Sequence, residues 1–361
     1  MRNSIKLIVI LTVIFFATLA LAQTRQFAQT QTVTAGQQFK SIKILNDMPA
    51  DQMGKVMNMI SASLGVDCKF CHESNNGGYE KEGFEHKETA RKMIRMVFDL
   101  NKAQFNGRPE INCNSCHNGR SHPQPSFPLT AAAVPPARPK QPEKGPTTDQ
   151  IADKFIAAIG GAEKIGAIKT RVIKANRVEP DGKTTEPETI WLSDGQYRSD
   201  VAYGKYVVTE LFANDTGTKY GDGTVIELKA DEAEQIRREG QLFFPLNIKA
   251  TYPKMDFRSI ENINGTEAYF FIATTAGGLR ERLYFDVNTG FLVRRTSSAQ
   301  TIFGNFVYQV DYSDYKDFGG IKMPVTTSYA VPHIQWTRKI IDVKANTPIN
   351  KTVFATPSGK M

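Results

Sequence analysis

The residues of this chain that could do chemistry are four cysteines, which stand in two copies of one pattern. The chain has 361 residues, and its cysteines occur only in the stretches CKFCH (residues 68–72) and CNSCH (residues 113–117). Closely spaced cysteine pairs serve three chemistries, namely a zinc site, a redox-active dithiol and the covalent attachment of c-type haem. The surrounding sequence distinguishes between them.

The first two chemistries leave part of the pattern unexplained. A zinc ribbon brings both pairs to one ion, but residues 72–112 separate Cys71 from Cys113, which is longer than the usual gap. A structural zinc also needs only four ligands, so the two histidines would have no role. A thioredoxin-like dithiol expects a strand–helix–strand context, which this helical stretch lacks, and it needs neither histidine.

Attachment of c-type haem uses every residue of the pattern. Two cysteines form thioether bonds with the vinyl groups of the porphyrin, and the histidine that follows binds the iron. We therefore predict two covalent haem c groups. The predicted thioether residues are Cys68, Cys71, Cys113 and Cys116, and the predicted proximal iron ligands are His72 and His117.

Two helices are expected to position these motifs. The first covers residues 47–65, with Pro49 in its first turn and Gly65 at its end. The second covers residues 86–107 and is closed by an Asn-Gly pair. Each helix is followed by a loop and a haem motif, so residues 41–120 form an internal repeat. Apolar residues fall at helical spacing in both helices: Met53, Met57, Ile60 and Leu64 in the first, and Met93, Met96 or Val97, and Leu100 in the second.

A haem that carries electrons without binding substrate needs a sixth iron ligand. The spare histidines are His86, His122 and His333, and we interpret His86 as solvated. A methionine sulfur on an apolar helix face can serve instead, and it raises the reduction potential, although most methionines pack in cores. From spacing alone, Met57 and Met53 are equal candidates for the first haem. Met93 and Met96 are equal candidates for the second.

Three stretches resemble the tetrahaem cytochrome c subunit of photosynthetic reaction centres. These are MNMISASLGVDCKFCH, ETARKMIRMVFDLN and INCNSCHNGRSHP, and the resemblance covers roughly residues 41–125. In that family a helix-borne methionine precedes each motif. The resemblance therefore implies that Met57 is the distal ligand opposite His72, and that Met93 is the distal ligand opposite His117. The family has four haems, whereas this chain has motifs for two.

The same resemblance implies a function and partners. The subunit re-reduces the photo-oxidised primary donor, so it implies a periplasmic electron carrier rather than an enzyme. The implied partners are membrane or soluble electron donors and acceptors, among them a membrane reaction centre or a respiratory complex. It also implies association with the membrane.

The N-terminus predicts export to the periplasm. Residues 1–22 have a basic start, an apolar run and the ending Ala-Leu-Ala, which is typical of a signal peptide cleaved before Gln23. The formal net charge is +8, and two of these charges are Arg2 and Lys6, so the mature chain carries +6. Its lysines and arginines are scattered without a long run, which argues against nucleic acid as a partner.

A different kind of sequence follows the second motif. Residues 123–146 contain eight prolines, which predicts a stiff, extended linker. Thr147 and Gln150 then form the capping box of a helix over residues 147–161. From Thr170 onward the pattern is β-rich, with a short helix at residues 230–245 and turn signals at residues 194–195, 264–265 and 288–290. This order predicts a curved antiparallel sheet with helices against one face.

The C-terminal segments LYFDVNTGFLVRR, VDYSDYKDFGGIKMPVTTSY and NTPINKTVFATP resemble periplasmic lipoprotein-carrier domains, the half-barrels related to LolA and LolB, over about residues 148–357. The predicted fold class is therefore multi-domain, with a mostly-α dihaem cytochrome c domain and a C-terminal α+β half-barrel. The predicted divisions are a signal peptide (1–22), a dihaem domain (23–122), a linker (123–146) and a lipoprotein-carrier-like domain (147–361).

Three classes of function use these features. The first is a dihaem electron carrier with six-coordinate irons. The second is a haem enzyme of the peroxidase or nitrite type, which needs an open distal site with acid–base residues. The third is a lipid-binding or partner-binding protein whose haem domain only supplies structure. The methionine-bearing helices before both motifs favour the electron carrier, which is not an enzyme.

Overall fold

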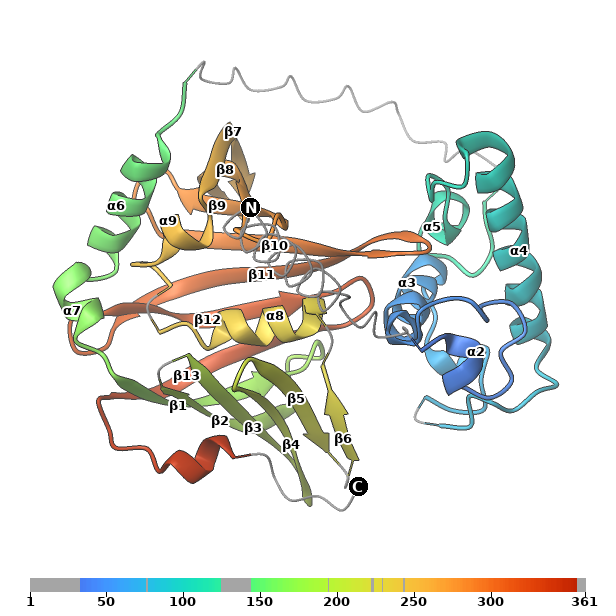
Figure 1. Cartoon of the computed structure of the whole chain (residues 1–361), viewed down its shortest axis with the longest axis horizontal. Helices are drawn as coiled ribbons and strands as arrows, with labels where there is room; N and C mark the ends of the chain where they lie inside the picture. The colour runs from blue at the N-terminus through green and yellow to red at the C-terminus, as the bar shows by residue number, and fades with distance from the viewer. Residues whose placement is uncertain are drawn as a thin grey trace, which may run out of the picture.

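The computed structural model describes residues 33–75, 77–124, 144–193, 195–221, 224–228, 230–242 and 244–355. The predicted signal peptide and residues 125–143 of the predicted linker lie outside the described residues. Figure 1 shows a group of helices formed by the N-terminal part and a large curved sheet formed by the C-terminal part. The predicted fold class is confirmed.

The N-terminal part is helical and carries both Cys-x-x-Cys-His motifs. Its elements are α2 (Ala35–Gln38), η1 (Ala50–Gln52), α3 (Met53–Leu64), η2 (Cys68–Phe70), α4 (Glu85–Phe105) and α5 (Cys113–His117). Gly65 ends α3 with φ 66° and Asn106 ends α4 with φ 54°. Both lie in the left-handed region, where glycine and asparagine close helices at little cost. The predicted ends of both helices are therefore confirmed.

The small core of this part lies between α3 and α4. Val56 on α3 and Ile94 and Val97 on α4 are buried there. The apolar residues of α4 divide between two stripes, because Met93, Met96 and Leu100 are exposed. The exposed fractions of these three residues are 38%, 50% and 40%. Helix α4 thus has one apolar stripe in the core and a second on its surface.

The C-terminal part is one open sheet of thirteen strands in the order β6-β5-β4-β3-β2-β1-β13-β12-β11-β10-β9-β8-β7. Neighbouring strands are antiparallel, and the pairing of β1 with β13 brings the two ends of this part together. The strands are β1 (Thr170–Val178), β2 (Thr185–Ser193), β3 (Gln196–Tyr203), β4 (Tyr206–Ala213), β5 (Thr216–Gly221), β6 (Thr224–Glu227), β7 (Lys254–Ile263), β8 (Thr266–Thr274), β9 (Arg280–Asp286), β10 (Leu292–Thr301), β11 (Gly304–Asp317), β12 (Lys322–Ala330) and β13 (Gln335–Ala345).

Helices lie on one face of this sheet, as predicted. They are α6 (Thr148–Ala158), α7 (Ala162–Gly166), α8 (Ala230–Glu239) and α9 (Ile248–Thr251), with α8 and α9 in front of the sheet and α6 and α7 along its left side in Figure 1. A short helix, η3 (Lys351–Phe354), follows the last strand. Helix α6 begins with the predicted capping box, in which Gln150 N–H donates to Thr147 Oγ1 at 3.2 Å. Phe155 of α6 packs edge-on against Phe285 of the sheet, with ring centroids 5.6 Å apart. Such contacts build the main core between the helices and the sheet.

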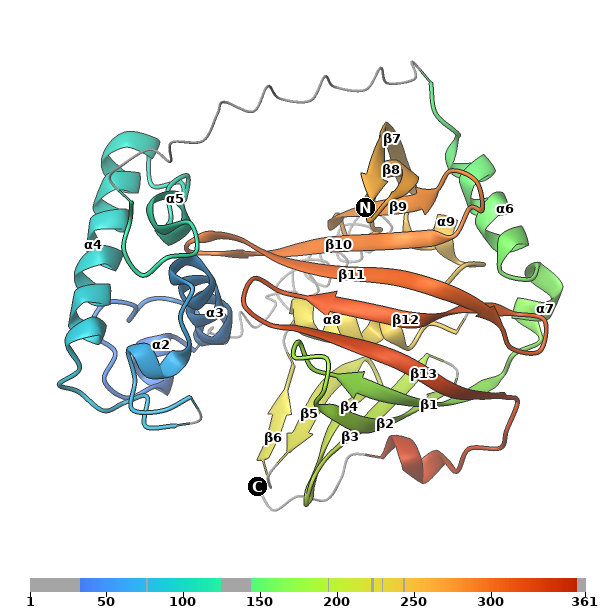
Figure 2. The ribbon, with the colours of Figure 1, turned by 180° about the vertical axis from the view of Figure 1, so that it is seen from behind.

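One hairpin leaves the sheet and reaches the N-terminal helices. Strands β10 and β11 extend past the body of the sheet, and Figures 1 and 2 show their tip beside α3 and α5. The tip consists of residues 301–304, and Phe303 belongs to the core between α3 and α4. None of the described helices combines the length and the apolar composition that crossing a bilayer requires.

Candidate functional site

The first motif folds as a single tight turn. The backbone N–H groups of Cys71 and His72 both donate to the carbonyl of Cys68, at 3.2 and 3.0 Å. Phe70 stacks on the exposed ring of His86, with centroids 4.0 Å apart. The two thiols and the imidazole are therefore carried by one short backbone unit, as attachment to a single planar group requires.

Helix α4 holds the loop that supports His72. The buried Lys87 ammonium donates to the carbonyls of Tyr79 and Lys81, at 2.9 and 2.7 Å. The Tyr79 ring in turn meets the His72 ring edge-on, with centroids 5.3 Å apart. Burial, and secondly the charge of Lys87, lower the pKa of His72. The imidazole is therefore neutral at neutral pH, which is the form that binds a metal.

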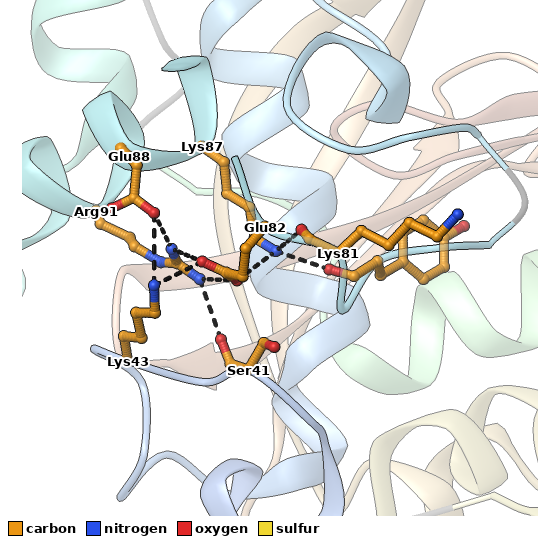
Figure 3. Close-up of polar contacts among 8 residues, drawn as sticks. Ser41, Lys43, Lys81, Glu82, Lys87, Glu88 and Arg91 are labelled. Carbon is orange, nitrogen blue, oxygen red and sulfur yellow. Dashed lines mark hydrogen bonds and ion pairs between the residues drawn. The ribbon is translucent and has the colours of Figure 1, made fainter. Parts of the chain in front are cut away.

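A network of charged side chains fixes this loop to the N-terminal segment and to α4. Figure 3 shows the Glu82 carboxylate among three cations. Arg91 donates to both of its oxygens, at 2.7 and 2.8 Å, Lys43 donates at 2.6 Å, and Lys87 lies 3.0 Å away. Arg91 also donates to the carbonyl of Ser41. Hydrogen bonds from these cations, with Arg91 first, hold the pKa of Glu82 far below its usual range.

The second motif is a five-residue helix with a cap at each end. Asn112 is the N-cap of α5, and its side-chain oxygen accepts from Asn114 N–H at 3.0 Å. The Asn112 N–H donates to Ser115 Oγ at 3.2 Å, which completes a capping box. Asn118 closes the helix in the left-handed region with φ 48°. These caps hold Cys113, Cys116 and His117 in fixed relative positions.

The imidazole of His117 is held in a defined tautomer. Its Nδ1 lies 2.9 Å from the carbonyl oxygen of Arg120. Because a carbonyl oxygen only accepts, this hydrogen bond requires a proton on Nδ1 and leaves Nε2 as the nitrogen that can bind a metal. A histidine that binds a metal through one nitrogen usually donates the other to such an oxygen. In the first motif, Nδ1 of His72 is buried and has no hydrogen-bond partner among the described residues. A buried polar atom of this kind normally has a partner, so the site is compatible with a bound group beside this ring.

Two contacts place the second motif against the helices that precede the motifs. The buried Asn101 of α4 donates to the carbonyl of Ile111 at 2.7 Å and accepts from its N–H at 3.0 Å. The carbonyl of Ser63 in α3 accepts from Gly119 N–H at 2.8 Å. Gly65 lies so close to this exit that a Cβ would stand 2.3 Å from the Gly119 carbonyl oxygen. Both α3 and α4 thus contact the second motif.

The cysteines themselves fit addition to haem better than a shared zinc. All four are free thiols, three half-buried and Cys116 exposed. Burial raises the pKa of Cys71 and of Cys113, so these thiols carry their protons. In the described part of the chain, no three His, Cys, Asp or Glu side chains gather closely enough to hold a metal ion. The two cysteine pairs therefore do not converge on one ion.

The candidate distal methionines lie in different surroundings. Met57 is half-buried against the core of the N-terminal part, as are Met53 and Met59. The sulfur of Met59 lies 3.5 Å from Oγ1 of Thr301, whose hydroxyl donates to the Gly304 carbonyl at 2.8 Å. Met93 and Met96 both lie in the exposed stripe of α4. The pairing of Met57 with His72 and of Met93 with His117 stays a prediction.

The sequence motifs did not predict the polar residues that position the two cysteine–histidine units. Asn101, Asn112 and Glu82 were not singled out from the sequence, and neither was the hairpin tip. The burial of Asn101 could have been predicted from its position, because it falls at helical spacing after Ile94 and Val97 on the same buried face of α4. A polar side chain at such a position is usually buried to satisfy backbone groups. The partners of Glu82 come from three separate segments, so no local pattern marks it.

Two Cys-x-x-Cys-His units lie on short helical turns, and this set of side chains fits the covalent attachment of c-type haem. Comparison with known proteins agrees, because residues 12–141 match the family described as photosynthetic reaction centre cytochrome C subunit. Over 140 residues the chain is 27% identical to cytochrome c-554 of Chloroflexus aurantiacus, covering 37% of this chain and 32% of that protein. It is 26% identical over 93 residues to the photosynthetic reaction center cytochrome c subunit of Roseobacter denitrificans, covering 24% and 25%.

The chain resembles this family over its N-terminal third, and it spans about a third or less of the length of these relatives. Similar solved structures cover the other part. A LolA superfamily protein from Nitrosomonas europaea has 10% identity and a TM-score of 0.41, and the match covers 59% of this chain and 99% of that one. A DUF1329 family protein from Desulfovibrio piger also has 10% identity and a TM-score of 0.41, covering 59% and 98%.

Proposed function

We propose that this protein is a dihaem c-type cytochrome that carries electrons in the periplasm. One haem is held by Cys68, Cys71 and His72, and the other by Cys113, Cys116 and His117. The observation that carries the proposal is the hydrogen bond from His117 Nδ1 to the Arg120 carbonyl. With Nδ1 engaged by a carbonyl oxygen, Nε2 is the nitrogen that can bind the iron.

The thiols make the covalent link without any oxidant. Each S–H would add across one vinyl group of a haem, so that a carbon–sulfur bond would form and the thiol proton would go to the neighbouring vinyl carbon. Free cysteines in a motif with no disulfide are the reactants that this addition needs. A haem iron bound in this way supplies one-electron transfer between its ferric and ferrous states.

A side chain of this protein that binds the sixth coordination position of each iron would prevent other ligands from binding there. We propose Met57 and Met93 as the distal ligands, which makes both irons six-coordinate. The exposed apolar stripe of α4, which includes Met93, supports this proposal, because exposed apolar stripes mark surfaces that are covered by something else. A six-coordinate site excludes peroxide and nitrite from the iron, so the proposed role is electron transfer and not catalysis.

The proposed partners are redox proteins. The curated relatives include reaction centre cytochrome subunits, so a membrane reaction centre or a respiratory complex is the proposed partner class, and membrane association is proposed with it. The N-terminal signal pattern of residues 1–22 supports export.

Intact-mass measurement on the exported full chain tests the proposal. The expected mass is that of the chain from Gln23 plus two haems that survive denaturation. A mass with one haem, or with zinc instead, overturns the dihaem assignment. Carbon monoxide then separates carrier from enzyme, because six-coordinate irons bind it poorly and an open distal site binds it readily.

A second candidate function, binding of a small amphipathic molecule, is favoured by a cavity of about 220 Å³ between the sheet and its helices. Aromatic and aliphatic side chains line it, among them Phe155 and Tyr315. Arg171 also lines it, and its guanidinium makes no hydrogen bond or ion pair among the described residues, while burial lowers its pKa to about 10. Titration with a fatty acid, compared between the full chain and Arg171→Gln, tests this function. Equal or absent binding in both contradicts it.

A further inference from the structure

The tip of the β10–β11 hairpin is buried inside the haem-binding part of the chain. Phe303 at this tip is 1% exposed, although it lies at the end of a hairpin that projects from the sheet. Its ring stacks on Phe98 of α4, with centroids 5.3 Å apart and planes inclined by 17°. It also packs with Val56, Ile94 and Val97 in the core of the N-terminal part. That core therefore includes a side chain supplied by the C-terminal sheet.

Polar contacts fix the tip in the same place. Gln52 Oε1 accepts from Ile302 N–H at 3.1 Å, and Met59 Sδ lies in contact with Thr301 Oγ1 at 3.5 Å. The adjacent β12–β13 turn makes a similar contact, since His333 N–H donates to Asn58 Oδ1 at 3.0 Å. Charge adds to these bonds, because the buried Lys55 ammonium lies 3.5 Å from both Asp231 and Glu232 of α8. Contacts of such varied kinds favour one rigid arrangement of the two parts.

One of these contacts reaches the second haem motif directly. Asn112 Nδ2 donates to the carbonyl of Phe303 at 3.3 Å, while its Oδ1 accepts from Asn114 N–H. A single amide side chain thus caps α5 with one end and holds the hairpin tip with the other. Gly304 lies beside the same segment, since a Cβ built on it would lie 3.6 Å from the Pro109 carbonyl oxygen.

From these contacts we propose that Phe303 is a positioning residue for the second haem. The hairpin tip sets where α5 lies relative to α4, and it excludes water from the side of the motif that it covers. The C-terminal sheet is then a structural part of the haem site and not an appended module. This inference rests on the proposed haem at Cys113–His117, while the contact between the hairpin and the motif can be measured with or without haem.

Substitutions in the full chain separate positioning from general stability. Phe303→Ala removes the stacked ring, and Phe303→Leu keeps most of its apolar volume. Phe306→Ala is the matched control, because Phe306 is equally buried in the same hairpin but packs against Tyr308 of its own strand. Asn112→Asp keeps an oxygen to cap α5 and loses the donor to the Phe303 carbonyl.

Redox titration of both haems and amide hydrogen exchange of residues 109–120 are the two readouts. Phe303→Ala and Asn112→Asp are expected to lower one midpoint potential, because water at the site favours the more charged ferric form, and to leave the other unchanged. Both variants are expected to speed exchange of residues 109–120, and Phe303→Leu to restore most of the wild-type behaviour. Phe306→Ala is expected to leave both readouts unchanged.

The proposal is overturned by either of two results. In one, Phe303→Ala and Asn112→Asp leave exchange and both potentials at the wild-type values. In the other, Phe306→Ala shifts the same potential as much as Phe303→Ala does. If the wild-type chain carries no haem at residues 113–117, the proposed function fails by that observation alone. The exchange comparison then decides whether the hairpin holds the motif.

Discussion

Asn101 of α4 and Ile111 are joined by two hydrogen bonds, one in each direction, across the loop that leads to the second cysteine pair. The side-chain amide donates to the Ile111 carbonyl at 2.7 Å and accepts from its N–H at 3.0 Å. Asn101 is only 5% exposed, so water does not replace either bond when the side chain is lost. This pair ties the position of the motif to the helix that carries Met93.

Asn101→Ala is therefore expected to destabilise the full chain by about 1–3 kcal/mol, since it leaves two backbone groups of the half-buried Ile111 without their protein partner. Denaturant unfolding followed by circular dichroism measures this loss. Gln104→Ala, at an exposed position on the same helix, is the control and is expected to change stability by less than about 0.5 kcal/mol. Equal effects of the two changes would show that the Ile111 contacts are unimportant.

The Glu82 network predicts a pH-dependent contribution to stability. Arg91, Lys43 and Lys87 hold the pKa of Glu82 below its usual value of about 4.3. The folded state therefore binds this proton more weakly than the unfolded chain does, and the network stabilises the fold above about pH 4.3. This stabilisation is lost as the pH falls below that value towards the lowered pKa of the folded state.

Comparison of the wild type with Glu82→Gln at a series of pH values measures this contribution. The stability difference is expected to be largest at pH 7, to shrink below about pH 4, and to decrease with added salt because Glu82 is exposed. Glu80→Gln changes an exposed carboxylate in the same loop and is the control, which is expected to change stability by less than about 0.5 kcal/mol. A Glu82→Gln difference that grows on acidification contradicts the sign of this linkage.

Lys55 predicts a coupling between the two parts of the chain. Its ammonium is buried between α3 and α8, near Asp231 and Glu232. Lys55→Met is expected to cost about 1–3 kcal/mol, because two carboxylates then lose their cation. Adding Asp231→Asn and Glu232→Gln is expected to recover part of this loss, as a multiple-mutant cycle of unfolding free energies would show. Strictly additive losses would mean that these groups do not interact.

Substitution of single cysteines tests whether each motif binds its own haem. Cys68→Ala is expected to reduce or remove haem at the first motif, and Cys113→Ala at the second. Peptide mass mapping of the exported variants locates the remaining haem. Loss of both haems from either single change would show that the two motifs fold as one unit.

If Met57 and Met93 bind the irons, their substitution is expected to change the haem absorption spectrum, whereas substitution of the other methionines is not. Met57→Ala and Met93→Ala are each expected to remove half of the weak long-wavelength band of methionine-bound ferric haem, and to lower one reduction potential. Met59→Ala is expected to affect stability instead, by about 2 kcal/mol, since its half-buried sulfur contacts Thr301. Met53→Ala and Met96→Ala are likewise expected to leave the band unchanged. A band lost in Met96→Ala would assign the ligand to that residue.

Local features of the fold were predictable from the sequence because their causes are local. Gly65 and Asn106 end their helices by adopting left-handed backbone angles, and Thr147 begins α6 through a bond to a residue three positions away. The turn at Asn264 and Gly265 forms with φ 52° and 90°, as that pair favours. Each of these signals lies within a few residues of its effect.

The contacts that hold the candidate site together were not predictable in this way. Phe303 meets Phe98 only because a hairpin from a distant part of the chain ends beside α4. The sequence around Phe303 is typical of an ordinary strand and turn, and it does not indicate which distant residues Phe303 contacts. The sequence predicted one apolar face on α4, whereas the structure has two apolar stripes. Helical spacing identifies apolar positions but does not determine which of them face the core.

The oxidation and spin state of the irons in the unmodified protein tests the central claim most directly. Low-temperature electron paramagnetic resonance of the oxidised, exported full chain measures it in one spectrum. Two low-spin ferric signals of equal intensity are predicted, because each iron has a histidine and a methionine ligand. A dominant high-spin signal, or a single haem signal, would contradict the account of a dihaem electron carrier.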